Sequence, residues 1–159
     1  KPKSTFEIAT MGVNNKQFFY WTTTGETGKL TYIVEQFRWN KWIKIGEVEG
    51  RGKTTKNSYS FKITPHSGEN KFRVKQIDYS SKPRYSSTTR YDAPSDEVTF
   101  SPKKAKTTIF FSQATLFEIC DSYGNIVKKG YGEKAEISNL KRGIYYLNYD
   151  NRTNTFIKK

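Results

Sequence analysis

Apolar and polar residues alternate along most of this chain, and that alternation restricts its fold more than any other feature. Residues 57–63 and 70–76 alternate most regularly. Successive side chains of a strand point to opposite faces, so a period of two is typical of half-buried strands. Because no segment keeps a period of 3.6 over about ten residues, we expect almost no helix.

Short predicted strands recur at intervals of about 8–12 residues, with turn-forming Gly, Pro, Asn and Asp between them. This spacing is typical of a β-sandwich. Residues 93–105 are rich in Pro and small polar residues, as is usual for a joint between domains. The sequence therefore predicts an all-β chain of two immunoglobulin-like or fibronectin type III-like β-sandwiches in tandem, over residues 1–97 and 98–159.

A single Cys and a single His limit the chemistry that the chain can perform. One Cys excludes a disulfide within the chain and a metal site with several thiolates. One His excludes a multi-histidine metal site and leaves little general-base capacity near neutral pH. His66 and Ser67 lie in a predicted turn with no nucleophile elbow around them. We therefore expect no enzyme, no metal and no cofactor, and an inert core thiol at Cys120.

The chain is strongly basic, with 28 Lys and Arg against 15 Asp and Glu and a formal net charge of +13. The charge is spread, because residues 1–100 hold 17 basic and 10 acidic residues and residues 101–159 hold 11 and 5. A nucleic-acid interface usually shows a dense basic stripe, so we expect no nucleic-acid partner. The balance favours an acidic protein, an anionic glycolipid or an anionic glycan, and Lys side chains that guard strand edges.

Two groups in the first predicted domain form a candidate ligand surface. Trp39 and Trp42 flank a predicted turn, where their rings either stack on a sugar or pack into the protein. Lys71, Arg73 and Lys75 share one face of a strand at intervals of about 6–7 Å, either as a basic patch or as an ordinary solvated face. Together they support the alternative of a surface adhesin or a glycan- or anion-binding module.

The order of motifs over residues 6–91 resembles a fibronectin type III-like module of Bacteroidota surface proteins. In that family an "L-x-W-x-T-x-x-E" strand precedes an apolar strand, an "I-G-x-V-x-G" segment and a "G-x-N-x-Y-R-L-K-Q-V-D" segment. The matching stretches here are residues 19–26 (FYWTTTGE), 32–36 (YIVEQ), 45–50 (IGEVEG) and 68–78 (GENKFRVKQID). The resemblance implies a β-sandwich.

Residues 98–159 are similar to the type A C-terminal sorting domain of proteins exported by the type IX secretion system. The matching stretches are residues 119–127 (ICDSYGNIV), 135–145 (AEISNLKRGIY) and 156–159 (FIKK). The family commonly opens with "Y-P-N-P", and this chain has FSPK at residues 100–103, which is an atypical start.

The second resemblance implies a non-catalytic secreted or cell-surface protein, either a small cargo of the type IX system or an adaptor associated with its machinery. It implies that the C-terminal domain docks on outer-membrane translocon and shuttle proteins, and we expect an exposed strand edge and its turns to fit a partner groove, aided by Lys charge. No run approaches the ~18 apolar residues of a transmembrane helix, so we expect no transmembrane segment. The positions that the resemblance assigns to partner binding are Gly124, Asn125, Val127, Gly143, Ile144, Tyr145, Lys158 and Lys159.

Overall fold

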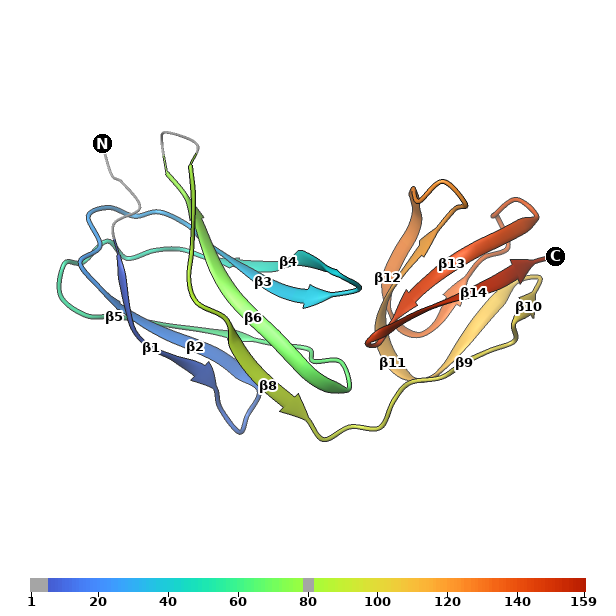
Figure 1. Cartoon of the computed structure of the whole chain (residues 1–159), viewed down its shortest axis with the longest axis horizontal. Coiled ribbons are helices and arrows are strands. Elements are labelled where there is room, and N and C mark those ends of the chain that lie inside the picture. Colours follow the sequence, from blue (N-terminus) through green and yellow to red (C-terminus); the bar gives the residue numbers. More distant parts are fainter. Residues whose placement is uncertain (1–5, 79–81) are drawn as a thin grey trace. The chain divides into compact units, whose positions relative to one another are not determined.

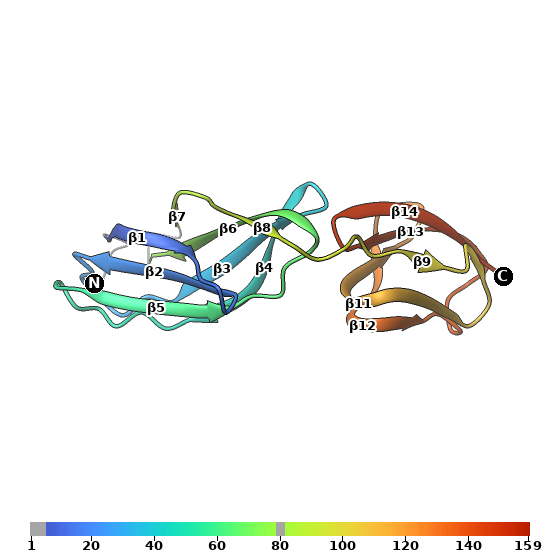
Figure 2. The same cartoon turned by 90° about the horizontal axis from the view of Figure 1, so that it is seen from below.

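The computed structural model describes residues 6–78 and 82–159, and it confirms the all-β prediction (Figures 1 and 2). Within those residues there are fourteen strands and no helix. No helix of the described chain is therefore long and apolar enough to cross a membrane. The chain divides into two units, one holding the described residues of Lys1–Pro65 and Glu69–Asp92, the other holding His66–Gly68 and Ala93–Lys159.

Two sheets build the first unit. One is three-stranded in the order β1-β2-β5, and the other follows the order β4-β3-β6-β7 with β8 also paired to β6. Neighbouring strands run antiparallel along the registered pairs. The strands are β1 (Glu7–Val13), β2 (Phe18–Thr24), β3 (Tyr32–Arg38), β4 (Lys41–Val48), β5 (Asn57–Lys62), β6 (Gly68–Ile77), β7 (Pro83–Tyr85) and β8 (Thr89–Ala93).

Aromatic side chains fill the core of the first unit. Trp21 is fully buried, and its ring lies 5.3–5.6 Å from the rings of Phe19, Tyr32 and Tyr59. Edge-to-face and offset ring pairs at such distances stabilise a core beyond the area that they bury. The high aromatic content of this half is thus explained by a core drawn from both sheets.

The last residue of the first motif, Glu26, is 3% exposed and lies at one end of this core. Its carboxylate accepts hydrogen bonds from the hydroxyls of Thr23, Tyr32 and Tyr59 and from the main-chain N–H of Gly52. Burial raises the pKa of Glu26, but these donors outweigh it and hold the pKa below its ordinary value. Burial and the neighbouring carboxylate raise the pKa of Tyr59 to about 12, so its hydroxyl stays a donor. The Trp, Thr and Glu of the motif therefore have structural roles.

The described strands of the second unit form one six-stranded hydrogen-bonded network. Its order is β10-β14-β13-β11-β12, and β9 also pairs with β11. Its longest strand has an irregular register between Phe110 and Thr115. Residues 107–111 and 114–121 each show a strand-like pattern in the sequence, which predicts two separate strands, whereas the structure has one long strand that is locally bulged. The strands are β9 (Phe100–Ser101), β10 (Lys104–Ala105), β11 (Thr108–Cys120), β12 (Ile126–Glu136), β13 (Gly143–Tyr149) and β14 (Arg152–Lys158).

The core of the second unit is small but closed. Ile109, Ile119, Ile137 and Leu147 are fully buried and are joined by a set of aromatic rings. Tyr145 stacks on Phe156 at 5.6 Å with an interplanar angle of 17°. Cys120 is also buried, as the sequence predicted.

Candidate functional site

Strand pairing brings the eight positions assigned to partner binding to one end of the second unit. The β11–β12 turn holds Gly124 and Asn125, and β13 runs antiparallel to β11 with Tyr146 opposite Cys120, so the start of β13 lies at the same end. In the next ladder Gly143 pairs with Lys158 at the end of β14. Positions from the turn, from the start of β13 and from the end of β14 thus lie at the same end of the unit.

The turn from Asp121 to Asn125 is held by the Asp121 carboxylate. That carboxylate accepts hydrogen bonds from the main-chain N–H groups of Tyr123 at 3.0 Å and Asn125 at 2.9 Å. The hydrogen bond from the Asn125 N–H is the main reason why the pKa of Asp121 is lowered. Gly124 has φ +86°, a conformation that side-chain-bearing residues rarely adopt. The sequence predicted this turn correctly, and its residues are set by backbone geometry.

The start of β13 is similarly constrained. Gly143 has φ +151° and no atom lies within 4 Å of a Cβ built there, so only its backbone conformation requires glycine. The Tyr145 side chain is buried, and its hydroxyl donates to the main-chain carbonyl oxygen of Lys141 at 2.7 Å. Ile144 lies between them in sequence and is 61% exposed, as strand alternation requires.

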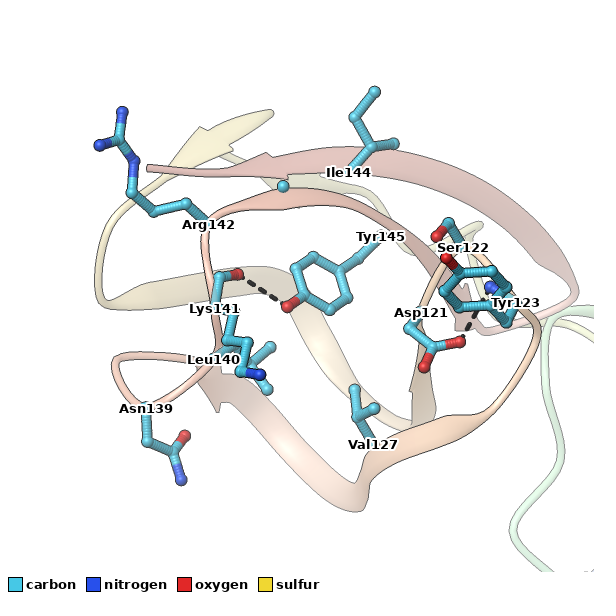
Figure 3. A pocket seen from close by; sticks show the side chains of 11 residues that line it. Asp121, Ser122, Tyr123, Val127, Asn139, Leu140, Lys141, Arg142, Ile144 and Tyr145 are labelled. Carbon is cyan, nitrogen blue, oxygen red and sulfur yellow. Dashed lines mark hydrogen bonds between the residues drawn. The ribbon is translucent and has the colours of Figure 1, made fainter.

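A groove of about 890 Å³ lies between the β11–β12 turn and the loop that precedes β13. Figure 3 shows the ring of Tyr145 between these two loops, with Ile144 pointing the opposite way. Tyr123 stands at one wall and is 88% exposed, and Val127 is also exposed. Lys141 and Arg142 place positive charge on the other wall. The groove can accept a partner that combines apolar and acidic groups.

Exposed apolar side chains continue from the groove onto the outer face of β13 and β14. Ile144 pairs directly with Ile157 across the ladder, and Tyr146 lies two residues along the same face. We call Ile144, Tyr146 and Ile157 the apolar strip. The resemblance assigned Ile144 alone from this strip, although Tyr146 and Ile157 carry the same signal, an apolar residue at the outward position of a strand.

The two C-terminal lysines are placed differently from each other. Lys158 is 7% exposed, and its ammonium donates to the carbonyl oxygen of Lys159. Lys159 is exposed, and its main-chain N–H donates to the carbonyl oxygen of Ala105 at 2.9 Å. Strand β14 is held by β13 on one side and β10 on the other, so the chain is ordered to its last residues. Of the two lysines, only Lys159 has an exposed side chain.

Four of the five residues of the candidate ligand surface in the first unit come together on one sheet face. The guanidinium of Arg73 lies 4.1 Å from the ring centre of Trp42, and its Nε donates to Glu35 at 2.8 Å. The ammonium of Lys75 lies 3.6 Å from the same carboxylate. Lys71 lies beside the ring of Phe37, which itself contacts the ring of Trp42. The basic patch and Trp42 therefore lie together on one face of the sheet.

Trp39 is not part of that face. It and Asn40 form the two-residue turn between β3 and β4, with φ values of 51° and 62°. Such paired positive φ values are typical of tight hairpin turns. The guanidinium of Arg38 lies 4.9 Å from the Trp39 ring centre.

In the described ranges no three His, Cys, Asp or Glu side chains gather in a way that could hold a metal ion.

Comparison with solved structures returns multidomain β proteins at low similarity. The FN1–FN3 domains of chicken CNTN1 are 14% identical with a TM-score of 0.33, over 99% of this chain and 66% of that one. The BSP domain of a biofilm-associated protein is 11% identical (TM-score 0.36), over 96% of this chain and 29% of that one. A tetra-tandem repeat from the extending region of a large adhesion protein is 13% identical (TM-score 0.37), over 96% and 46%. The chain thus spans less than two thirds of each, and these similarities are too low to indicate a function.

Comparison with protein families gives a specific result for the second unit. The family described as the secretion system C-terminal sorting domain matches residues 101–159. No curated protein sequence matches the chain. The family match confirms the resemblance of the C-terminal segment and marks the chain as exported, to the cell surface or the extracellular space.

Proposed function

We propose that this exported chain, whose residues 101–159 match a secretion system C-terminal sorting domain, is a non-catalytic protein that type IX machinery recognises through one end of its second unit. The recognising surface consists of the groove and the apolar strip. Its partners are translocon or shuttle proteins of the outer membrane, and the chain acts as a small cargo or as an adaptor of that machinery.

One observation carries the proposal: residues scattered over three motifs of the matched segment meet where apolar side chains are exposed. Contiguous exposed apolar groups with a polar rim are typical of protein interfaces. Ile144, Ile157 and Tyr123 supply the apolar groups, and Lys141 and Arg142 supply a rim that favours an acidic partner.

Docking by side chains fits this unit better than docking by an added strand. Among the described strands, β12 pairs only with β11, so it is an edge strand. It carries Lys128, Lys129 and Lys134 together with a register shift near its start, and both features oppose pairing with a further strand.

Export of the full chain from a type IX-competent cell tests the proposal. We expect Ile144→Asp with Ile157→Asp to leave the protein inside the cell envelope, because two charges interrupt the apolar strip. The matched control is Tyr131→Asp, an equally exposed aromatic residue at the middle of β12. Circular dichroism of the purified variants is expected to show that both remain folded. Export of the double variant at the level of the unaltered chain would overturn the proposal.

Binding to purified shuttle or translocon protein gives a second readout that does not depend on the cell. The double variant is expected to lose binding by about tenfold or more, as is usual when central apolar contacts are removed. Equal binding by the double variant and the Tyr131 control would contradict the assignment of this surface.

A further inference from the structure

The basic and aromatic face of the first unit has no part in the sorting-domain proposal. It lies on the outer side of β3, β4, β6 and β7, and strand register sets its composition. Glu35 pairs with Arg73 and with Lys44, and Lys75 pairs with Tyr85. We define the cation face as Phe37, Trp42, Lys71, Arg73, Lys75 and Tyr85.

Arg73 is fixed at the centre of the cation face. Its guanidinium lies 4.1 Å from the ring centre of Trp42 and 4.1 Å from that of Tyr85, and its Nε is bound by Glu35. Stacking on two rings and one charged hydrogen bond restrict the side chain before any ligand arrives. Its terminal N–H groups are not used by any residue that the structure describes, so they remain donors for an external oxyanion.

Two further cations extend this site into a row. Lys71, Arg73 and Lys75 occupy alternate positions of β6, so their side chains leave one face at intervals of about 6–7 Å. Glu35 is the carboxylate within ion-pair range of Arg73 and Lys75, and Glu69, at the next alternate position of β6, is paired with Arg90. Among the described residues, no carboxylate lies within ion-pair range of Lys71. The row therefore keeps net positive charge and matches anions repeated along an extended polymer.

We propose that the cation face binds an acidic polysaccharide, through carboxylate or sulfate groups spaced along the row. Strands β3 and β6 are inner strands of their sheet, so their main-chain groups are already paired and a peptide cannot add there as a strand. Tyr85 and Trp42 stay partly exposed beside the cations, where ring surfaces pack against the C–H faces of sugars.

Binding of the full chain to immobilised alginate and heparin, with dextran as the neutral reference, tests this proposal. We expect binding to alginate or heparin and none to dextran. Lys71→Gln with Lys75→Gln is expected to weaken it about tenfold or more, since two charge-assisted contacts are lost. The matched control is Lys53→Gln with Lys56→Gln, two exposed lysines of the same unit outside the cation face. Equal losses in the two double variants would show diffuse attraction and overturn the proposal.

Arg73→Lys separates geometry from charge. It keeps the positive charge but removes the planar group that stacks on both rings, so binding is expected to fall severalfold. Unchanged binding in a folded Arg73→Lys protein would contradict the central role of the stacked guanidinium. Poly-glutamate or single-stranded DNA bound as tightly as the polysaccharides would overturn the assignment of partner class. None of these outcomes depends on export, so they are independent of the sorting-domain proposal.

Discussion

The hydroxyl of Tyr145 donates a hydrogen bond to the main-chain carbonyl oxygen of Lys141, with 2.7 Å between the oxygens. The bond joins the loop before β13 to the strand that follows it. A tyrosine hydroxyl bound to the backbone a few residues upstream is a known corner device of β-sandwiches. Here it also holds one wall of the groove, so a residue assigned to recognition acts by shaping the surface.

Removing that hydroxyl is expected to destabilise the second unit. Tyr145→Phe leaves the Lys141 carbonyl without this donor, and we expect the free energy of unfolding to fall by about 1–2 kcal/mol. The control is Tyr146→Phe, whose ring is exposed, with an expected change below about 0.5 kcal/mol. Urea unfolding followed by far-UV circular dichroism measures both. Because all three Trp residues lie in the first unit, Trp fluorescence serves as the internal reference. Equal effects of the two substitutions would contradict the corner role.

We expect the cost of replacing Gly124 to depend only on how readily the new residue adopts a positive φ. No atom lies within 4 Å of a Cβ at this position, and φ is +86°. Asn adopts positive φ far more readily than a β-branched residue. We therefore expect Gly124→Val to cost about 1 kcal/mol or more beyond Gly124→Asn in urea unfolding. The same cost for both would show that space, rather than φ, selects glycine.

Two glutamates of the β4-β3-β6-β7 sheet form ion pairs, and we expect them to contribute differently to the free energy of unfolding. Glu35 is 8% exposed and binds Arg73, whereas Glu47 is 52% exposed and binds Lys44. Glu35→Gln removes the countercharge of a partly buried cation, and we expect it to cost about 1–3 kcal/mol. Glu47→Gln is expected to cost less than about 0.5 kcal/mol. Thermal unfolding followed by Trp fluorescence tests the difference, and a larger loss in Glu47→Gln would refute it.

Stability of the first unit is expected to fall in acid because of Glu26. Its pKa in the folded protein lies below the ordinary value of 4.5, so the folded state favours the charged carboxylate. The stabilisation is complete above pH 4.5 and is lost as the pH drops through the folded pKa. Trp-fluorescence unfolding between pH 7 and pH 3 measures it. Glu26→Gln should be less stable at pH 7 and should lose less stability in acid. Glu7→Gln, at an exposed position of β1, should keep the acid dependence of the unaltered chain.

Much of the fold follows from local pattern. The alternation at residues 57–63 and 70–76 predicts β5 and β6, and the Gly-Asn pair at 124–125 predicts the hairpin between β11 and β12. These signals are local because side-chain direction in a strand and positive φ in a turn depend on neighbouring residues only. The bulged β11 was predicted as two strands because a bulge breaks the local period without ending the pairing.

The sequence by itself determined that the chain is all-β, that it holds two sandwiches, and that its C-terminal motifs are those of a sorting domain. Only the tertiary structure decided that Gly143 pairs with Lys158, that Lys158 is buried while Lys159 is exposed, and that Arg73 lies between Trp42 and Tyr85. Each of these depends on the register between strands distant in sequence. A shift of one residue would turn every side chain of a strand to the other face, and the local pattern does not specify which distant strand stands opposite.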